Sequence, residues 1–437
     1  MKPVKLTLRG GGTLLTLTTD KFKTELMTIT LPLLHSQRTA RLCRILFDTI
    51  KRGCRAYPDI MSLNAHLDDL YDANIANMYS TTGEMASAGF VCECLDKSYV
   101  PGGEDLLCGT LETLKEMIYS PLLDENGLFP EKTVELEKRN LCDNILASDN
   151  DPRIHSYQLC RDLLFEGEAY GQRLVGTVDD VMALDCRELT DFYHEFLVTS
   201  APSFIYIGSR DVKEVKEIAE KYFGDLGGGH SQKGNTIIKK ATPPMRMVEE
   251  EMAVLQGKLT IGFRSDISPE DKDLYASIIF NDIFGGSPAS KLFRNVREKQ
   301  SLCYYCSSSL DFFKGALFVR SGISNANKDK VINEVLAQFE DIRKGNISDY
   351  EFECAKKSLD NYYRQASDSA YALENYYRTR LISEMNTTIE EAAEKLRSVT
   401  KEDVIRAARR YEAGVCAFVR GTLSDADDNG EEGEYDE

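Results

Sequence analysis

The chain has 437 residues, about three times the usual length of one domain, and a formal net charge of −18. This acidity excludes an extended basic surface for nucleic acid or for an anionic membrane. The chain contains only five histidines, and the two nearest in sequence, His35 and His66, are 31 positions apart. An HxxEH zinc motif needs two histidines four positions apart on one helix, so this chain cannot contain one.

Twelve cysteines are scattered along the chain. The first residues, MKPVKLTLRGGG, have no apolar segment of the kind found in signal peptides. No stretch approaches the roughly 20 apolar residues of a membrane span. We therefore expect a cytoplasmic protein that does not bind membranes and that has reduced thiols rather than a disulfide framework.

The first half of the chain alternates strand and helix patterns, which predicts an α+β fold with helices packed on an antiparallel or mixed sheet. The first half ends with a strand pattern at 204–208 that is followed by an amphipathic helix pattern at 212–223. Strand patterns cover 4–8, 13–18, 21–34, 74–95 and 204–208, and helix patterns cover 37–52, 60–71, most of 103–197, and 212–223.

The second half repeats this order, with strand patterns within 251–263 and 303–321, then long helices, then a last strand at 415–420. A glycine-rich polar segment near the middle, GGGHSQKGN, is the best candidate for a linker. We therefore predict two duplicated α/β sandwich halves. The predicted parts are 1–226, a linker at 227–240, 241–423, and an acidic disordered tail at 424–437 with no specific role.

The segment REKQSLCY contains two residues that could contact a peptide. Arg297 follows a helix-like segment at 290–296 and could hold a carbonyl or carboxylate oxygen, and Tyr304 could donate a hydrogen bond to an oxyanion. Composition alone favours a helix-dipole partner for Arg297 and half-buried packing for Tyr304. The nearby Cys303 and Cys306 lie three positions apart in a strand pattern. Residues with that spacing face opposite sides of a strand, so we predict two unconnected thiols.

The run GGSPASKLFRNVREKQSLCYYCSSS resembles a signature of the pitrilysin/insulinase family of metallopeptidases. In that family, a glycine pair precedes Ser-(Arg/Lys)-Leu-Phe and Arg-Glu-Lys, and a tyrosine follows the arginine by seven positions, as Tyr304 follows Arg297. The resemblance implies two halves like those of insulinase and mitochondrial processing peptidase, with helices on mixed, largely antiparallel sheets. These halves enclose a peptide-binding chamber, and a half-length chain implies a dimeric partner.

The resemblance also implies a degenerate zinc site in the first half. Active members place HxxEH on the helix that corresponds to RLCRILFDTIKRGC, where the matching residues are Cys43, Leu46 and Phe47, give or take a shift of about one residue. The third zinc ligand of the family, a glutamate, corresponds to Glu135 or to the neighbouring Glu137. An aliphatic and an aromatic side chain cannot bind zinc, so this chain is expected to hold no metal.

Three further stretches, TDKFKTELMTITLPL, YPDIMSLNAHLDDLYDANI and NGLFPEKTVELEKRNLCDNI, are similar to the YmfF-type bacterial branch of the family. That branch supplies non-catalytic subunits associated with the modification of elongation factor P, and its companion is a YmfH-type subunit that keeps HxxEH. The resemblance therefore implies a heterodimer in which the partner brings zinc while Arg297 and Tyr304 contact the peptide substrate. A scaffold without a role in hydrolysis, a homodimer, and a catalyst that uses Cys43 as nucleophile remain alternatives.

Overall fold

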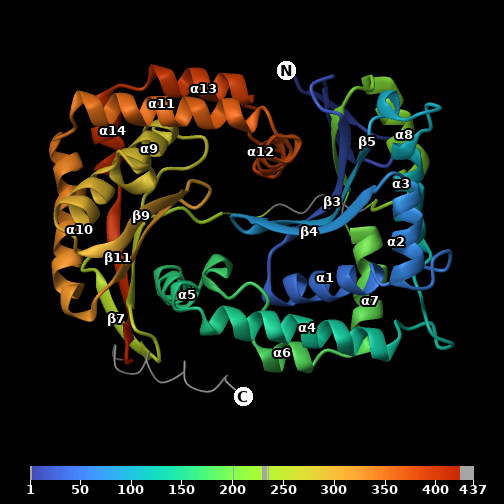
Figure 1. Cartoon of the computed structure of the whole chain (residues 1–437), viewed down its shortest axis with the longest axis horizontal. Coiled ribbons are helices and arrows are strands. Elements are labelled where there is room, and N and C mark those ends of the chain that lie inside the picture. Colours follow the sequence, from blue (N-terminus) through green and yellow to red (C-terminus); the bar gives the residue numbers. More distant parts are fainter. Residues whose placement is uncertain (1, 200, 229–233, 235, 424–437) are drawn as a thin grey trace, which may run out of the picture. The chain divides into compact units, whose positions relative to one another are not determined.

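The structure is a computed structural model that describes residues 2–199, 201–228, 234 and 236–423 (Figure 1). The central part of the predicted linker, at 229–233 and 235, and the predicted tail at 424–437 lie outside the described residues. The chain divides into two compact units. Unit 1 comprises Met1–Ile145, Arg173–Asn235 and Gln365–Thr388, and unit 2 comprises Leu146–Gln172, Thr236–Arg364 and Ile389–Glu437.

Unit 1 contains a mixed sheet with the strand order β1-β2-β6-β3-β5-β4. Strands β2 and β6 are parallel, and the other neighbours are antiparallel. The longest strands, β3 and β5, are buried along nearly their whole length, as expected for apolar strands covered on both faces. The bounds are β1 Val4–Thr7, β2 Thr13–Thr18, β3 Thr24–Leu34, β4 Asn74–Thr82, β5 Met85–Leu95 and β6 Ser203–Gly208.

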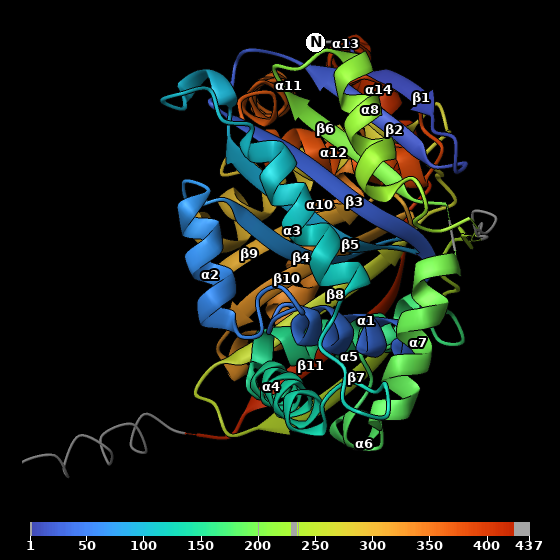
Figure 2. The same cartoon turned by 90° about the vertical axis from the view of Figure 1, so that its right-hand side faces the viewer.

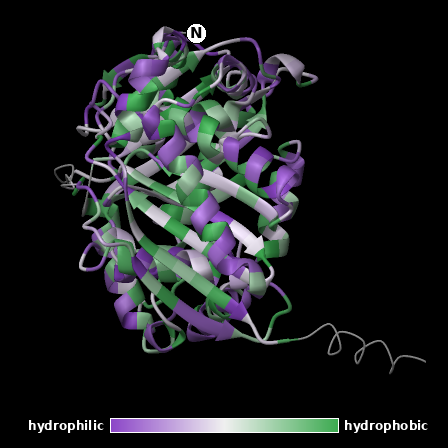
Figure 3. Ribbon diagram, turned by 90° about the vertical axis from the view of Figure 1, so that its left-hand side faces the viewer, coloured by the Kyte–Doolittle hydropathy of each residue, from purple (hydrophilic) through white to green (hydrophobic). Residues whose placement is uncertain are grey.

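Unit 2 contains a sheet with the order β7-β11-β8-β10-β9, in which only the β7–β11 pair among the described strands is parallel. This order and these directions match those of β2-β6-β3-β5-β4 in unit 1, which confirms the predicted duplication and the α+β class. Most of the strands are coloured as hydrophobic in Figure 3. The bounds are β7 Arg246–Met252, β8 Gly257–Arg264, β9 Cys303–Asp311, β10 Ala316–Ile323 and β11 Glu412–Gly421.

The helices of unit 1 pack around its sheet, with α3 and α8 on one face (Figure 2). Most of them begin at a side chain that caps the free backbone N–H groups of the first turn, as Ser36 does for α1. The bounds are α1 Gln37–Ile50, α2 Ile60–Asp69, η1 Lys97–Tyr99, α3 Leu106–Tyr119, α4 Glu131–Asn150, α6 Val178–Met182, α7 Cys186–Thr199, α8 Val212–Phe223 and α12 Ala370–Ile382.

The helices of unit 2 include two π-helices, η3 and η4, in the segment that resembles the family signature. π-Helices are rare in proteins, and those that occur are often found at functional sites. The bounds are α5 Pro152–Leu164, η2 Ala169–Gly171, α9 Leu274–Asn281, η3 Asp282–Gly286, η4 Leu292–Lys299, η5 Asn325–Asn327, α10 Lys328–Lys344, α11 Asp349–Ala366, α13 Ile389–Ser398 and α14 Lys401–Ala408.

Each unit takes one helix from the opposite half of the sequence. Helix α5 packs on β8 and β11 in unit 2, and helix α12 packs on β3 and β6 in unit 1. Since β3 and β6 hold the places in unit 1 that β8 and β11 hold in unit 2, the exchange is reciprocal. A division of the sequence at 227–240 does not include this exchange, because it keeps each helix with the half that surrounds it in the chain.

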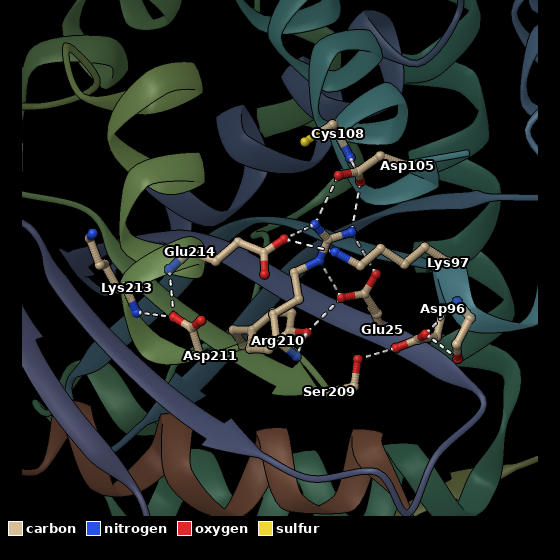
Figure 4. A network of polar contacts seen from close by, with 12 residues as sticks. Glu25, Asp96, Lys97, Asp105, Cys108, Ser209, Arg210, Asp211, Lys213 and Glu214 are labelled. Atoms are coloured by element: carbon tan, nitrogen blue, oxygen red, sulfur yellow. Dashed lines mark hydrogen bonds and ion pairs between the residues drawn. The ribbon is translucent and has the colours of Figure 1, made fainter. Parts of the chain in front are cut away.

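Arg210 closes a network of ion pairs at the corner between β6 and α8 (Figure 4). Its guanidinium donates to Glu25 of β3 at 2.6 Å, to Asp105 at the start of α3 at 2.7 Å, and to Glu214 of α8 at 2.6 Å. Tyr206 of β6 also donates to Glu25, at 2.6 Å. The network therefore joins two strands and two helices of unit 1 through one buried arginine.

No helix within the described residues is both long enough and apolar enough to cross a bilayer.

Candidate functional site

Arg297 lies near the end of the π-helix η4, which extends beyond the helix-like segment predicted at 290–296 and so includes this residue. Its guanidinium stacks over the ring of Phe293, 4.6 Å from the ring centroid, and lies 3.6 Å from the Glu298 carboxylate. The side chain remains 41% exposed. Arg297 is therefore oriented by an aromatic face and keeps guanidinium N–H groups available for a carbonyl or carboxylate.

Tyr304 is the extra residue of a β-bulge near the start of β9, the edge strand of the unit 2 sheet. Cys303 pairs with Ile323 and Tyr305 pairs with Gly322, so Tyr304 has no partner in the register of β10. Its side chain is 61% exposed. Bulges redirect side chains and are common beside active sites, and this one presents a phenol at a sheet edge.

The bulge also changes the placement of the two cysteines in CYYC. The prediction that Cys303 and Cys306 face opposite sides is wrong. The extra residue between them shifts the alternation of side chains by one position, so both cysteines lie on the same side of the strand. Cys303 and Cys306 pair with Ile323 and Ser321, which are two positions apart on β10. The two thiols act on one another's pKa in opposite directions, with that of Cys303 lowered and that of Cys306 raised.

Arg297 influences the ionisation of the cysteine at the start of β9. The neighbouring Cys306 thiol lowers the pKa of the Cys303 thiol to about 7, although partial burial opposes the shift. Ser321 and the positive charge of Arg297 lower this pKa further. Arg297 therefore acts electrostatically on the residue next to Tyr304, and the two residues predicted to contact substrate belong to one local region of unit 2.

The predicted degenerate zinc site lies elsewhere, in the core of unit 1. Cys43, Leu46 and Phe47 lie on one face of α1 and are at most 1% exposed. The Phe47 ring contacts those of Phe90 and Phe196 at centroid distances of 5.1 and 5.4 Å. Burial raises the pKa of the Cys43 thiol well above its ordinary value. This face packs a hydrophobic core, and a thiol held neutral there is a poor nucleophile.

The exposed face of α1 carries Arg44 and Asp48, four positions apart. Asp48 accepts a hydrogen bond of 2.6 Å from Asn77. Desolvation by its neighbours raises the pKa of Asp48, the Asn77 hydrogen bond opposes the shift, and the negative charge of Glu137 adds to it. Glu137 is buried and accepts from Arg52 at 2.5 Å. A shift of one residue in the register therefore places Arg44, Phe47 and Asp48 in the three positions of HxxEH, with Glu137 nearby.

Glu135 is engaged separately. Its carboxylate accepts a hydrogen bond of 2.6 Å from the buried ammonium of Lys138, which also donates to the backbone oxygen of Leu184 at 2.8 Å. Within the described residues, no hydrogen bond joins Glu135 to α1. The polar pair Arg44 and Asp48, in a helix that is otherwise apolar around them, is the signal in the sequence that could have located the exposed face.

The residues near the exposed face do not fit zinc. Arginine cannot bind the ion, and the carboxylate of Glu137 is already paired with Arg52. Within residues 2–199, 201–228, 234 and 236–423, no group of three or more histidine, cysteine, aspartate or glutamate side chains is placed to hold a metal ion.

Comparisons with known proteins agree with this geometry. The family described as "Peptidase M16 inactive domain" matches residues 184–359. A protein of Bacillus subtilis (strain 168) called "Probable inactive metalloprotease YmfF" is 30% identical over 415 residues, which cover 94% of this chain and 96% of the relative. The predicted resemblance to the family and to its YmfF-type branch is therefore confirmed.

Two solved structures share the fold. The crystal structure of a conserved protein from Enterococcus faecalis V583 has a TM-score of 0.87 and 26% identity, and the match covers 97% of this chain and 100% of that one. The peptidase M16 inactive domain from Pseudomonas fluorescens has a TM-score of 0.79 and 17% identity, covering 97% and 99%. The strand order, the signature around Arg297 and Tyr304, and these relatives together show that the chain belongs to the pitrilysin/insulinase (M16) family of metallopeptidases.

Proposed function

We propose that this chain is the non-catalytic subunit of a heterodimeric zinc peptidase and that it supplies Arg297 and Tyr304 to a peptide-binding chamber shared with its partner. The observation that carries the proposal is the β-bulge that exposes Tyr304 beside the region of Arg297. The presence of both residues at the spacing of the family signature argues against a purely structural role.

The state of α1 supports a non-catalytic role. A peptidase of this family needs two histidine ligands and a glutamate base on one helix face. In this chain, one possible alignment of the motif places buried core residues at these positions. The alignment shifted by one residue places Arg44 and Asp48 there. The relative in Bacillus subtilis that is described as a probable inactive metalloprotease is consistent with the same role.

The partner is proposed to be an M16 subunit of the YmfH type that keeps HxxEH and holds the zinc ion. The ion would supply the activated water in the partner's own site. In this chain, the Arg297 guanidinium would hold a backbone oxygen or the C-terminal carboxylate of the peptide. The Tyr304 hydroxyl would donate a hydrogen bond to the oxyanion that develops at the scissile carbonyl. The reduced cytoplasm is the proposed compartment.

The test is the Tyr304→Phe variant in a complex with the HxxEH-bearing partner, assayed on an unstructured peptide. Loss of one oxyanion donor is expected to lower kcat by roughly 100- to 1,000-fold without preventing assembly, as measured by size exclusion. Tyr362→Phe is the matched control, because Tyr362 lies on α11 and is also 61% exposed. Unchanged hydrolysis by the Tyr304 variant would favour the scaffold role and would overturn the proposal.

Arg297 is tested in the same complex by Arg297→Met. Its role in binding predicts a raised KM, since the contact is made to the peptide before the chemical step. Arg294→Met is the control on the same π-helix, where Arg294 is exposed and stacks on Tyr350 instead. Equal KM values for the two variants would remove Arg297 from the binding site.

A further inference from the structure

We propose that Cys303 and Cys306 are an oxidisable thiol pair that reacts with peroxides and closes to a disulfide across Tyr304. Neither the family resemblance nor the proposed peptidase role assigns a function to these cysteines. The inference rests on the bulge in β9, which brings two thiols that are three positions apart to the same side of one strand.

The two thiols differ in accessibility in the way that such a pair requires. Cys303 is half-buried and is the first residue of an edge strand, whereas Cys306 is 3% exposed. An oxidant in solution can therefore reach Cys303 more readily than Cys306. The bulge places Cys306 on the same side of β9 as Cys303, and Cys306 is the neighbour that acts most strongly on the Cys303 thiol.

The surroundings favour the thiolate of Cys303 over that of deeply buried cysteines such as Cys92 and Cys416. The Cys306 thiol, the Ser321 hydroxyl and the Arg297 charge all stabilise the anion, and the pKa of Cys303 falls to about 7 against the effect of burial. By contrast, burial raises the pKa of Cys92 and Cys416 to about 12. Because the thiolate is the reactive form, oxidation is directed to Cys303.

The chemistry balances with hydrogen peroxide as the oxidant. The Cys303 thiolate attacks one peroxide oxygen, so that an S–O bond forms, the O–O bond breaks, and hydroxide leaves and takes up a proton as water. The Cys306 sulfur then attacks the Cys303 sulfenic acid, the S–S bond forms, the S–O bond breaks, and the departing hydroxide takes the Cys306 proton as water. Two thiols lose two electrons to one peroxide, and two waters are released. A dithiol reductant reverses the reaction by exchange.

Closure would change the bulge itself. A disulfide holds its two Cβ atoms about 3.5–4.5 Å apart, which would fix the start of β9 in one geometry. Tyr304 lies inside the ring that the disulfide closes, and its phenol would be re-aimed.

The test treats the full chain with a small molar excess of hydrogen peroxide, blocks the remaining thiols by alkylation, and maps the peptides by mass spectrometry. We expect two of the twelve thiols to be protected from alkylation, both within 303–306, and to return after reduction with dithiothreitol. In Cys306→Ser, the Cys303 sulfenic acid should persist and should be trapped by dimedone. Cys354→Ser is the control, because Cys354 is also half-buried but lies on α11; this variant should form the disulfide as the wild type does.

Full alkylation of both cysteines after peroxide treatment of the wild type would overturn the proposal. So would dimedone labelling of Cys354 at the same rate as Cys303 in the Cys306→Ser variant. Neither readout uses hydrolysis, so the outcome is independent of the proposed peptidase role.

Discussion

Glu168 and Arg264 form a buried bidentate ion pair, with Nη1 of the arginine 2.8 Å from Oε1 and Nη2 3.3 Å from Oε2 of the glutamate. The ammonium of Lys314 donates to the same carboxylate at 2.9 Å. Glu168 follows α5, the helix that unit 2 takes from the first half of the sequence, and Arg264 ends β8. Arg264 also donates to the backbone oxygen of Leu164 at the end of α5. These contacts fasten the exchanged helix to its sheet.

Glu168→Gln is expected to destabilise the protein by about 3–5 kcal/mol, because it leaves the buried charges of Arg264 and Lys314 without their partner. The free energy of unfolding from urea titration measures the effect. Glu166→Gln is the control, since Glu166 pairs with Arg246 at the surface and its loss is expected to cost at most about 1 kcal/mol. Similar losses for the two variants would mean that the buried pair does not anchor α5.

The same carboxylate predicts a dependence of stability on acid. Burial raises the pKa of Glu168, but the hydrogen bonds from Arg264 and Lys314 outweigh this effect and lower the pKa below its ordinary value of 4.5. A carboxylate whose pKa is lowered in the folded state contributes its full stabilisation when the pH is above the ordinary pKa. This stabilisation is lost as the pH falls through the lowered pKa. Urea midpoints should therefore fall more steeply below pH 4.5 for the wild type than for Glu168→Gln. Parallel curves would contradict the assignment.

Arg210→Met is expected to cost about 3–5 kcal/mol, because it leaves Glu25 as an uncompensated charge in the core of unit 1. The double variant Arg210→Met/Glu25→Met should recover part of this loss, since replacing both partners by apolar groups avoids the isolated charge. Arg9→Met is the surface control, because Arg9 is 86% exposed where it pairs with Glu220. Thermal unfolding of the three variants measures their order of stability. A double variant that is less stable than Arg210→Met would contradict the prediction.

Much of the fold follows from local patterns in the sequence. The strand pattern in 13–18 and the amphipathic pattern of 212–223 correspond to β2 and α8 with the same bounds. These patterns report which face of a segment is apolar and leave open which sheet will cover it. The reciprocal exchange of α5 and α12 could not be predicted for that reason, because an amphipathic pattern shows that a helix has an apolar face and not which strands that face covers.

The candidate site was predictable only in part. The family signature selected Arg297 and Tyr304 as candidates, but neither the π-helix nor the bulge has a recognised signal in single-sequence patterns. The bulge in turn reversed the expected sides of Cys303 and Cys306, since one extra residue shifts every position before it to the other face. On α1, the family comparison left the register open by one residue, and only the burial of Cys43 and the exposure of Asp48 separate the two faces.

The register of α1 can be tested by rebuilding a zinc site. Arg44→His/Asp48→His places two histidines four positions apart on the exposed face near Glu137, which gives the His₂Glu donor set of several zinc enzymes. We expect this variant to bind one zinc ion per chain, measured by metal analysis after dialysis, and to gain about 2.7 kcal/mol of stability at a zinc concentration 100 times the Kd.

Two controls accompany that variant. Adding Glu137→Gln should abolish the zinc-dependent gain, because the third ligand is lost. Cys43→His/Phe47→His places the same histidine pair in the core, where it should bind no zinc and should lower the melting temperature by opening the packing of Phe47 against Phe90 and Phe196. A zinc ion can be held only where the histidine pair on α1 and the third ligand on α4 come together. Zinc binding by the core pair, with none by the exposed pair, would therefore show that Cys43 and Phe47 mark the ancestral ligand positions.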